Sequence, residues 1–305
     1  MMRLCVPAAA GSILVLALAI GVSQAEVSAT WSPGPTATLG IGKMQLIGDD
    51  PDPVGGNIWH RFSPVGSANV VLNPEGEANG DGEPSILSDP ARGWFVAAWS
   101  RNSVSGFDVV VSRFTNGAWT TPQVVADEAA NALDPQLVVD AAGVAHLLYW
   151  RDGASPQVLE VRSTDLETWS SPSVVSQPGE VACRPSGAVY QGVLRVAYEV
   201  HDFGFGNSPR EVVLSRYDGA AFVTEVVAMT NNTGMVSPQV HAQAGKLWVD
   251  WVDWVDAESG SAGEVGWTRL DAAGHWEPVH YDPFANSSER EYFVRGTVRL
   301  QAIQP

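Results

Sequence analysis

The fold is decided by EPSILSDPARGWFVAAWSR, residues 83–101, because its outline returns three more times along the chain. It opens with Pro after a polar residue, passes a Gly, and closes on an aromatic residue six positions after that Gly. The same marks open three later segments, DPQL from Asp134, RPSG from Arg184 and SPQV from Ser237. The prolines are 51, 50 and 53 residues apart, so the chain contains an internal repeat.

Each repeat contains four short segments with the composition of strands. Turns rich in Gly, Pro, Asp and Asn separate them, and FVAAW, AHLLYW and VLRVAY carry the Val, Leu and aromatic residues of buried strands. A further aromatic residue follows late in each repeat, at Trp119, Trp169, Phe222 and Trp276. Four strands in about 50 residues is the period of a β-propeller blade. We therefore predict an all-β chain, a β-propeller of five four-stranded blades, with six blades as the alternative.

The two ends of the repeat region predict a split closing blade. EYFVRGTVRLQAI, residues 291–303, has the shape of the first two strands of a repeat. IWHRFSPVGSANVVLN, residues 58–73, has the shape of the last two. Pairing them would close the ring and remove the exposed sheet edges. The propeller then spans residues 58–305, and residues 26–57 are an N-terminal extension, an outer strand or part of a sixth blade.

The first 25 residues predict export. Arg3 precedes an apolar run over residues 13–22, and residues 23–25, SQA, supply the small residues of a cleavage site. The run is short for a membrane span of roughly 20 residues, which favours a signal peptide over a membrane anchor. We expect a secreted or periplasmic protein that does not bind membranes after cleavage at residue 25.

Composition excludes several classes of function. The 17 Lys and Arg residues against 34 Asp and Glu give a net charge of −17, which opposes binding to nucleic acid or to an anionic membrane. Two cysteines, Cys5 and Cys183, argue against a disulfide framework and against a Cys-based zinc site. We predict no cofactor and a monomer. The exception is EANGDGE, residues 77–83, where Asp81 lies in a candidate calcium loop whose alternative is an acidic surface turn.

Polar residues gather at one end of the predicted blades. The first two strands of a blade are antiparallel, so the start of the first and the end of the second lie together. Carboxylates, arginines and aromatic residues at such a mouth are typical of a site for a carbohydrate or a carboxylate, and the alternative is a structural network of ion pairs. The candidate residues are Glu83, Arg101, Asp134, Trp150, Arg151, Arg184, Glu199 and Asp253.

The segment STDLETWSSP, residues 163–172, resembles a motif of a known family. This segment resembles a shortened Asp box, the S-x-D-x-G-x-x-W hairpin of the sialidase-like BNR-repeat propellers, and the other repeats carry degenerate forms of it. The repeat pattern is also similar, more weakly, to five-bladed arabinanase-type glycosidases. In such a hairpin the Asp can bond turn amides and the Trp packs between sheets, so we interpret the box itself as structural.

The resemblance implies roles for particular residues. Arabinanase-type propellers draw carboxylates from the starts of the first strands, which here are Glu83 and Asp134. The third repeat has Arg184 where that pattern has an acid, and Glu199 on the next strand is the substitute. We predict Asp134 and Glu199 as the acid/base pair, with Glu83 as a further catalytic candidate. Sialidase-like propellers use an arginine triad, so the predicted substrate-binding residues are Arg101, Arg151, Arg184, Trp150 and Asp253.

These features together predict an exported propeller that binds or hydrolyses a glycan at its central funnel. The arginines favour an anionic, sialidase-type substrate, and an enzyme of this kind would be a glycoside hydrolase. The alternative is a non-catalytic propeller, a lectin-like or protein-interaction module, because one fold hosts both classes. In both cases the expected partner is a carbohydrate or a glycoconjugate.

Overall fold

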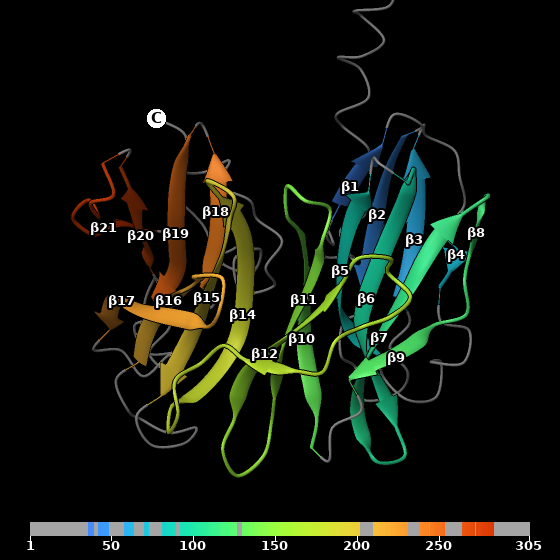
Figure 1. Ribbon diagram of the computed structural model, residues 1–305, viewed down its shortest axis with the longest axis horizontal. Helices are drawn as coiled ribbons and strands as arrows, with labels where there is room; N and C mark the ends of the chain where they lie inside the picture. The colour runs from blue at the N-terminus through green and yellow to red at the C-terminus, as the bar shows by residue number, and fades with distance from the viewer. Residues whose placement is uncertain are drawn as a thin grey trace, which may run out of the picture.

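The computed structural model describes residues 36–39, 42–48, 58–63, 70–72, 81–89, 92–126, 130–201, 210–230, 238–243, 245–253, 264–271 and 273–283. Strands and turns make up this part of the chain, so the all-β prediction is confirmed. The strands form five antiparallel sheets, and successive strands of the chain are neighbours in them, except that β8 and β9 of the second sheet both pair with β7 (Figure 1). No helix long and apolar enough to span a bilayer occurs in these ranges.

The strand bounds follow the repeat. The first sheet contains β1 (Thr36–Leu39), β2 (Gly42–Gly48), β3 (Ile58–Ser63) and β4 (Val70–Val71). The second contains β5 (Gly82–Asp89), β6 (Trp94–Ser103), β7 (Gly106–Thr115), β8 (Ala118–Trp119) and β9 (Gln123–Ala126), with both β8 and β9 on β7. The third contains β10 (Ala132–Val139), β11 (Ala145–Arg151), β12 (Gln157–Ser163) and β13 (Ser173–Val174). The fourth contains β14 (Val181–Tyr190), β15 (Val193–His201), β16 (Arg210–Tyr217) and β17 (Phe222–Thr230). The fifth contains β18 (Gln239–Gln243), β19 (Lys246–Asp253), β20 (Glu264–Leu270) and β21 (His280–Pro283).

The first sheet corrects the prediction of a split blade. β3 is bonded to β2 on one side and to β4 on the other, so both of its edges are occupied by N-terminal strands. The segment 291–303, which we expected beside β3, lies outside the described residues. The boundary expected at residue 58 therefore falls inside a sheet, because β1 and β2 supply its first two strands. The predicted signal peptide, residues 1–25, also lies outside the described residues.

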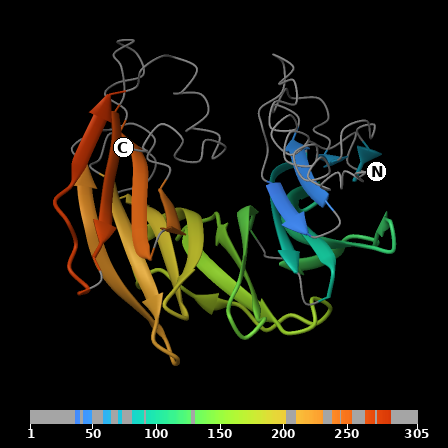
Figure 2. The same ribbon diagram turned by 90° about the horizontal axis from the view of Figure 1, so that it is seen from above.

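Successive sheets pack on one another through their first strands. β1 contacts β5, β5 contacts β10, β10 contacts β14, and β14 contacts β18. The sheets consequently follow an arc with their first strands on its inner side, as the view from above shows (Figure 2).

The aromatic residue that closes the second strand of each repeat lies in the core. These side chains are fully buried, at 0% exposure, in Trp99, Tyr149, Tyr198 and Trp251. Gly266 on β20 makes room for the last of them, because a Cβ there would lie 2.3 Å from Trp251 Cε2. The late aromatics Trp119, Trp169, Phe222 and Trp276 are partly buried against the same clusters. The repeat thus places large side chains between successive sheets.

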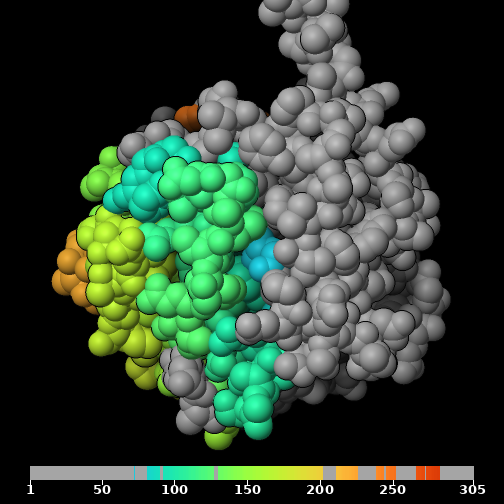
Figure 3. All heavy atoms as spheres, turned by 90° about the vertical axis from the view of Figure 1, so that its right-hand side faces the viewer, coloured from blue at the N-terminus to red at the C-terminus, as the bar shows by residue number. Residues whose placement is uncertain are grey.

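The turn that carries the Asp-box resemblance ties two sheets together. Asp165 Oδ1 accepts the amides of Glu167 and Thr168 at 2.8 and 2.7 Å, as expected for a structural turn. Arg113 of β7 reaches Glu167 at 2.7 Å, and Gln123 of β9 donates to the Glu167 carbonyl at 2.9 Å. Figure 3 shows this edge of the molecule, where the second and third sheets lie side by side.

Candidate functional site

Three successive sheets begin their first strand with the same irregularity. A β-bulge shifts the register between Gly82 and Ser85, and equivalent shifts follow Leu133 and Cys183. The residue before Pro in each bulge has a left-handed backbone, with φ of 56° at Glu83, 51° at Asp134 and 52° at Arg184. A residue other than Gly costs about 1–3 kcal/mol in this conformation, which persists where the fold requires it. The repeat therefore places Glu83, Asp134 and Arg184 at one end of three adjacent inner strands.

Each bulge residue bonds to the residue that follows the buried aromatic on the second strand. Ser100 Oγ donates to Glu83 Oε2 at 2.9 Å, Trp150 Nε1 donates to Asp134 Oδ2 at 2.8 Å, and Arg184 Nη1 donates to Glu199 Oε2 at 2.9 Å. These contacts confirm that the start of the first strand and the end of the second meet at one end of each sheet. We call the group Glu83, Ser100, Asp134, Trp150 and Arg184 the mouth.

Glu83 and Asp134 form a carboxyl pair across two sheets. The Asp134 backbone N–H donates to Glu83 Oε2 at 2.8 Å. Burial, the charge of Asp134 and a hydrogen bond with its carboxyl group raise the pKa of Glu83 to about 8. Glu83 is exposed to solvent, although many protein atoms lie around its carboxyl group. At neutral pH most Glu83 carboxyl groups are therefore protonated.

Glu199 is placed differently from the prediction. Its side chain is fully buried, and its two oxygens contact Arg184 Nη1 at 2.9 Å and His201 Nε2 at 2.8 Å. Burial of the guanidinium lowers the pKa of Arg184. The negative charges of Glu199, Cys183 and Asp134 outweigh this effect, and the pKa of Arg184 is raised overall. The carboxyl pair at the mouth is thus Glu83 with Asp134. The expected pairing of Asp134 with Glu199 is corrected, because Glu199 lies beneath Arg184.

The other predicted binding residues are not gathered at one point. Arg101 is paired in register with Asp108, and Arg151 donates to the Gln157 side chain. Strand neighbours point to opposite faces, so Arg101 and Arg151 leave their strands on the side opposite to Ser100 and Trp150. These two guanidinium groups therefore do not join Arg184 on that side. Asp253 ends β19, in register with Glu264.

Asp81, the residue of the candidate calcium loop, is buried against its own sheet. Its Oδ2 accepts the Trp99 indole N–H at 3.0 Å, and its Oδ1 accepts the Asn102 amide at 3.1 Å. Both oxygens thus fix the start of β5 to the end of β6. Residues 77–80 of the loop lie outside the described residues, and calcium binding stays a prediction.

The sequence analysis missed two residues beside the mouth. Cys183 and His201 are buried with Glu199, and their ligand atoms lie within 4.8 Å of one another. Cys183 is opposite Glu199 in the register of β14 and β15. The spacing of 183, 199 and 201 matches no local metal motif, so pairing of the two strands was the signal needed to find the group.

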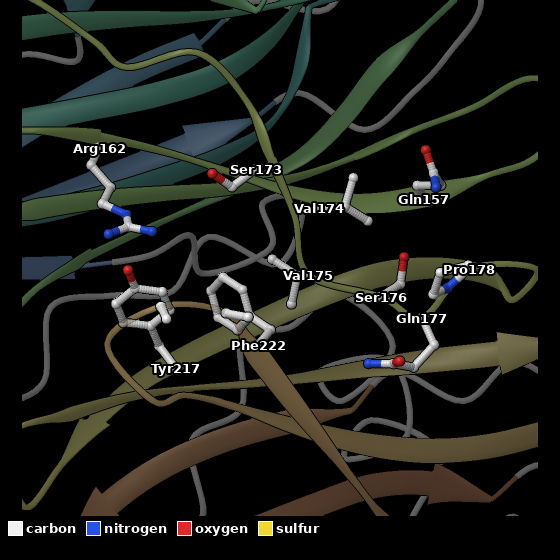
Figure 4. A pocket seen from close by; sticks show the side chains of 12 residues that line it. Gln157, Arg162, Ser173, Val174, Val175, Ser176, Gln177, Pro178, Tyr217 and Phe222 are labelled. Carbon is white, nitrogen blue, oxygen red and sulfur yellow. The ribbon is translucent and has the colours of Figure 1, made fainter.

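A cavity of about 380 Å³ lies at the outer strands between the third and fourth sheets. Arg162 of β12 and Tyr217 of β16 line it, with the guanidinium carbon 4.2 Å from the tyrosine ring centroid (Figure 4). Arg162 Nε also donates to Glu160 at 2.9 Å. Its lining includes none of the mouth residues, so the cavity is separate from the mouth.

Comparison with known proteins supports the fold. No protein-family model matches the chain, and no curated protein matches its sequence. The Hadza microbial sialidase Hz136 aligns with 16% identity and a TM-score of 0.54, covering 83% of this chain and 59% of that one. The exo-β-1,3-galactanase of Phanerochaete chrysosporium aligns with 14% identity and a TM-score of 0.54, over 82% of this chain and 62% of the other. The chain thus spans about three fifths of the length of both structures.

An exo-1,5-α-L-arabinanase from a bovine ruminal metagenomic library aligns over 86% of this chain and 99% of its own, with 14% identity and a TM-score of 0.51. At these identities the likeness concerns the fold. The chain has the fold of sialidase-like and arabinanase-type propellers, and the resemblance found in the sequence is confirmed.

Proposed function

We propose that this chain is an exported five-bladed β-propeller that binds a glycan at the mouth and cleaves a glycosidic bond there. Export rests on the signal-peptide pattern of residues 1–25. The five successive sheets support five blades, and a closed propeller would bring the fifth sheet against the first. The glycosidases of similar fold support a carbohydrate as the ligand.

The carboxyl pair of Glu83 and Asp134 carries the proposal of catalysis. Glycoside hydrolysis needs one carboxyl group that gives a proton to the leaving oxygen and a second that acts as base or nucleophile. Glu83, with a pKa of about 8, holds the proton at neutral pH, and Asp134 is the neighbouring group. Two carboxyl groups around a glycosidic bond are roughly 5–9.5 Å apart, so a substrate enters by separating this hydrogen-bonded pair.

The surroundings of the pair favour a neutral sugar. Arg184 pairs with the buried Glu199 carboxylate and Arg151 donates to the Gln157 side chain, so a substrate carboxylate would compete with contacts already made. Trp150 is half-buried, and its indole is fixed by Asp134 at 2.8 Å. An aromatic ring in such a position provides an apolar face on which a sugar ring can stack.

The test is incubation of the purified protein with a panel of neutral, sialylated and uronic oligosaccharides, with products identified by mass spectrometry. We expect release of a sugar that falls at least about 100-fold in Glu83→Gln and Asp134→Asn, since each removes a proton-transferring group. Asp218→Asn is the matched control, because Asp218 caps a turn between β16 and β17. Equal release by all three variants would contradict the assignment.

A non-catalytic glycan-binding module is the second candidate. It is favoured by the direct hydrogen bonding of Glu83 with Asp134, which satisfies both groups without a substrate. This alternative predicts calorimetric binding of an oligosaccharide without product, weakened by Trp150→Ala. Product formation that depends on Glu83 would exclude it.

A further inference from the structure

Cys183, Glu199 and His201 form a buried cluster beneath the mouth. Cys183 comes from β14, and Glu199 and His201 come from the same face of the adjacent β15. Their exposed fractions are 1%, 0% and 2%. His201 Nε2 lies 2.8 Å from Glu199 Oε1 and 3.5 Å from Cys183 Sγ. A sulfur, an oxygen and a nitrogen atom thus converge on one point in the protein interior.

One proton on His201 Nε2 serves only one of its two neighbours, so the other contact depends on the proton of the Cys183 thiol. His201 Nε2 carries at most one hydrogen, yet it faces both the carboxylate oxygen and the sulfur. A cation between the three atoms would contact all of them. For a tetrahedral zinc ion, ligand lengths of about 2.3 Å for sulfur and 2.0–2.1 Å for nitrogen place those two atoms about 3.5 Å apart. The observed sulfur–nitrogen distance of 3.5 Å fits such an ion, whereas the 2.8 Å between His201 Nε2 and Glu199 Oε1 is a hydrogen-bond distance that would widen to about 3.3 Å on binding.

The carboxylate is oriented by a group outside the cluster. Arg184 Nη1 holds Glu199 Oε2 at 2.9 Å and leaves Oε1 turned toward His201 and Cys183. Neighbouring groups that fix a ligand in this way are characteristic of metal sites. The geometry differs from a nucleophilic Cys–His–Glu triad, because sulfur and carboxylate meet the same imidazole nitrogen, whereas a triad uses both nitrogens.

The third sheet contains a similar buried group of Arg, Glu and His side chains that has no thiol. In the third sheet, Arg162 Nε holds Glu160 at 2.9 Å and Glu160 Oε1 contacts His146 Nδ1 at 2.6 Å. This Arg–Glu–His arrangement is also buried at its carboxylate and imidazole. The fourth sheet differs by the thiol of Cys183 at the imidazole nitrogen, whereas in the third sheet Asp140 Oδ2 lies 3.6 Å from His146 Nε2.

We propose that Cys183, Glu199 and His201 bind one divalent cation of the zinc class, with a fourth position left for a water molecule or another donor. A thiolate, an imidazole and a carboxylate are the ligand types that zinc accepts. The ion ties the ends of β14 and β15 together directly below Arg184. Binding converts the Cys183 thiol to a thiolate and releases its proton to solvent.

The experiment uses Co²⁺ as a spectroscopic probe for zinc. The full-length chain carrying Cys5→Ser, in which Cys183 is the remaining cysteine, is unfolded with a chelator and refolded in excess Co²⁺. We expect one Co²⁺ per chain, visible tetrahedral absorption bands and a thiolate-to-cobalt charge-transfer band in the near ultraviolet. Added Zn²⁺ should remove all these bands by displacement.

Variants then separate the proposed site from other binding. Cys183→Ser should lose the charge-transfer band, His201→Gln should weaken Co²⁺ binding at least tenfold, and the control His146→Gln should change neither. Circular dichroism confirms folding of each variant. Absence of a thiolate band in the folded parent chain, or its persistence in Cys183→Ser, overturns the proposal. The readout needs no glycan, so failure of the proposed catalytic function leaves it intact.

Discussion

The most informative substitution is Arg184→Met, which removes the cation above a fully buried carboxylate. Glu199 has no solvent exposure, and the Arg184 side chain is 29% exposed. Removing one member of a buried ion pair costs about 3–5 kcal/mol, mainly because the other charge is left without compensation. The partial exposure of Arg184 and the remaining contact of Glu199 with His201 place the expected loss near 3 kcal/mol.

The assay is urea unfolding at pH 7 in the presence of a chelator, followed by fluorescence. Arg184→Met combined with Glu199→Gln should recover most of the loss and unfold within about 1 kcal/mol of the parent, because no buried charge remains. Arg113→Met is the control, since its partner Glu167 is 63% exposed and the expected cost is about 0–1 kcal/mol. A loss below 1 kcal/mol in Arg184→Met, or no recovery in the double variant, would refute the reasoning.

Three further results are expected. Stability should fall as pH rises from 4.5 to 8, because the folded protein keeps the Glu83 proton in this window and the unfolded chain does not. In Glu83→Gln the melting temperature should change less with pH over the same window. Tyr198→Phe should lose about 1 kcal/mol in urea unfolding, because its buried hydroxyl bonds Glu180 at 3.1 Å, and an unchanged free energy of unfolding would contradict that contribution. Gly266→Ala should destabilise by about 1–3 kcal/mol, since its Cβ would meet Trp251 at 2.3 Å, and an unchanged melting temperature would contradict that packing.

The sequence predicted the strands well because the repeat is periodic and its marks are local. Pro, Gly and the closing aromatic recur in each unit; the Gly corresponds to the turn, the aromatic to a buried side chain such as Trp99, and in the second, third and fourth sheets the Pro corresponds to the bulge. The predicted pairing of residues 291–303 with β3 in a split closing blade was wrong, because strand pairing is not decided by local sequence. GKMQLIG, residues 42–48, lacks the marks of the repeat but pairs with β3, so the place beside β3 that we expected for residues 291–303 is taken by another strand.

The candidate site was predictable in position but only partly in its partners. Antiparallel strands required Glu83 and Asp134 to lie at one end of their sheets, and they do. The sequence could not show that each bulge turns its residue toward the second strand, which engages Arg184 with Glu199. Nor could it show that Cys183 meets His201, because that contact depends on the register of two strands.

Measuring the pKa of Glu83 is the most direct test of its proposed role as the proton donor. Carbon-13 labelling of the glutamate side chains and an NMR titration from pH 4 to 10 would follow each carboxyl group separately. We predict one glutamate with a pKa of about 8, assigned by its absence in Glu83→Gln. In Asp134→Asn this pKa should move down but stay above the ordinary value, because burial remains when the charge is removed. A Glu83 that titrates at its ordinary value in the parent protein would contradict the proposed proton donor.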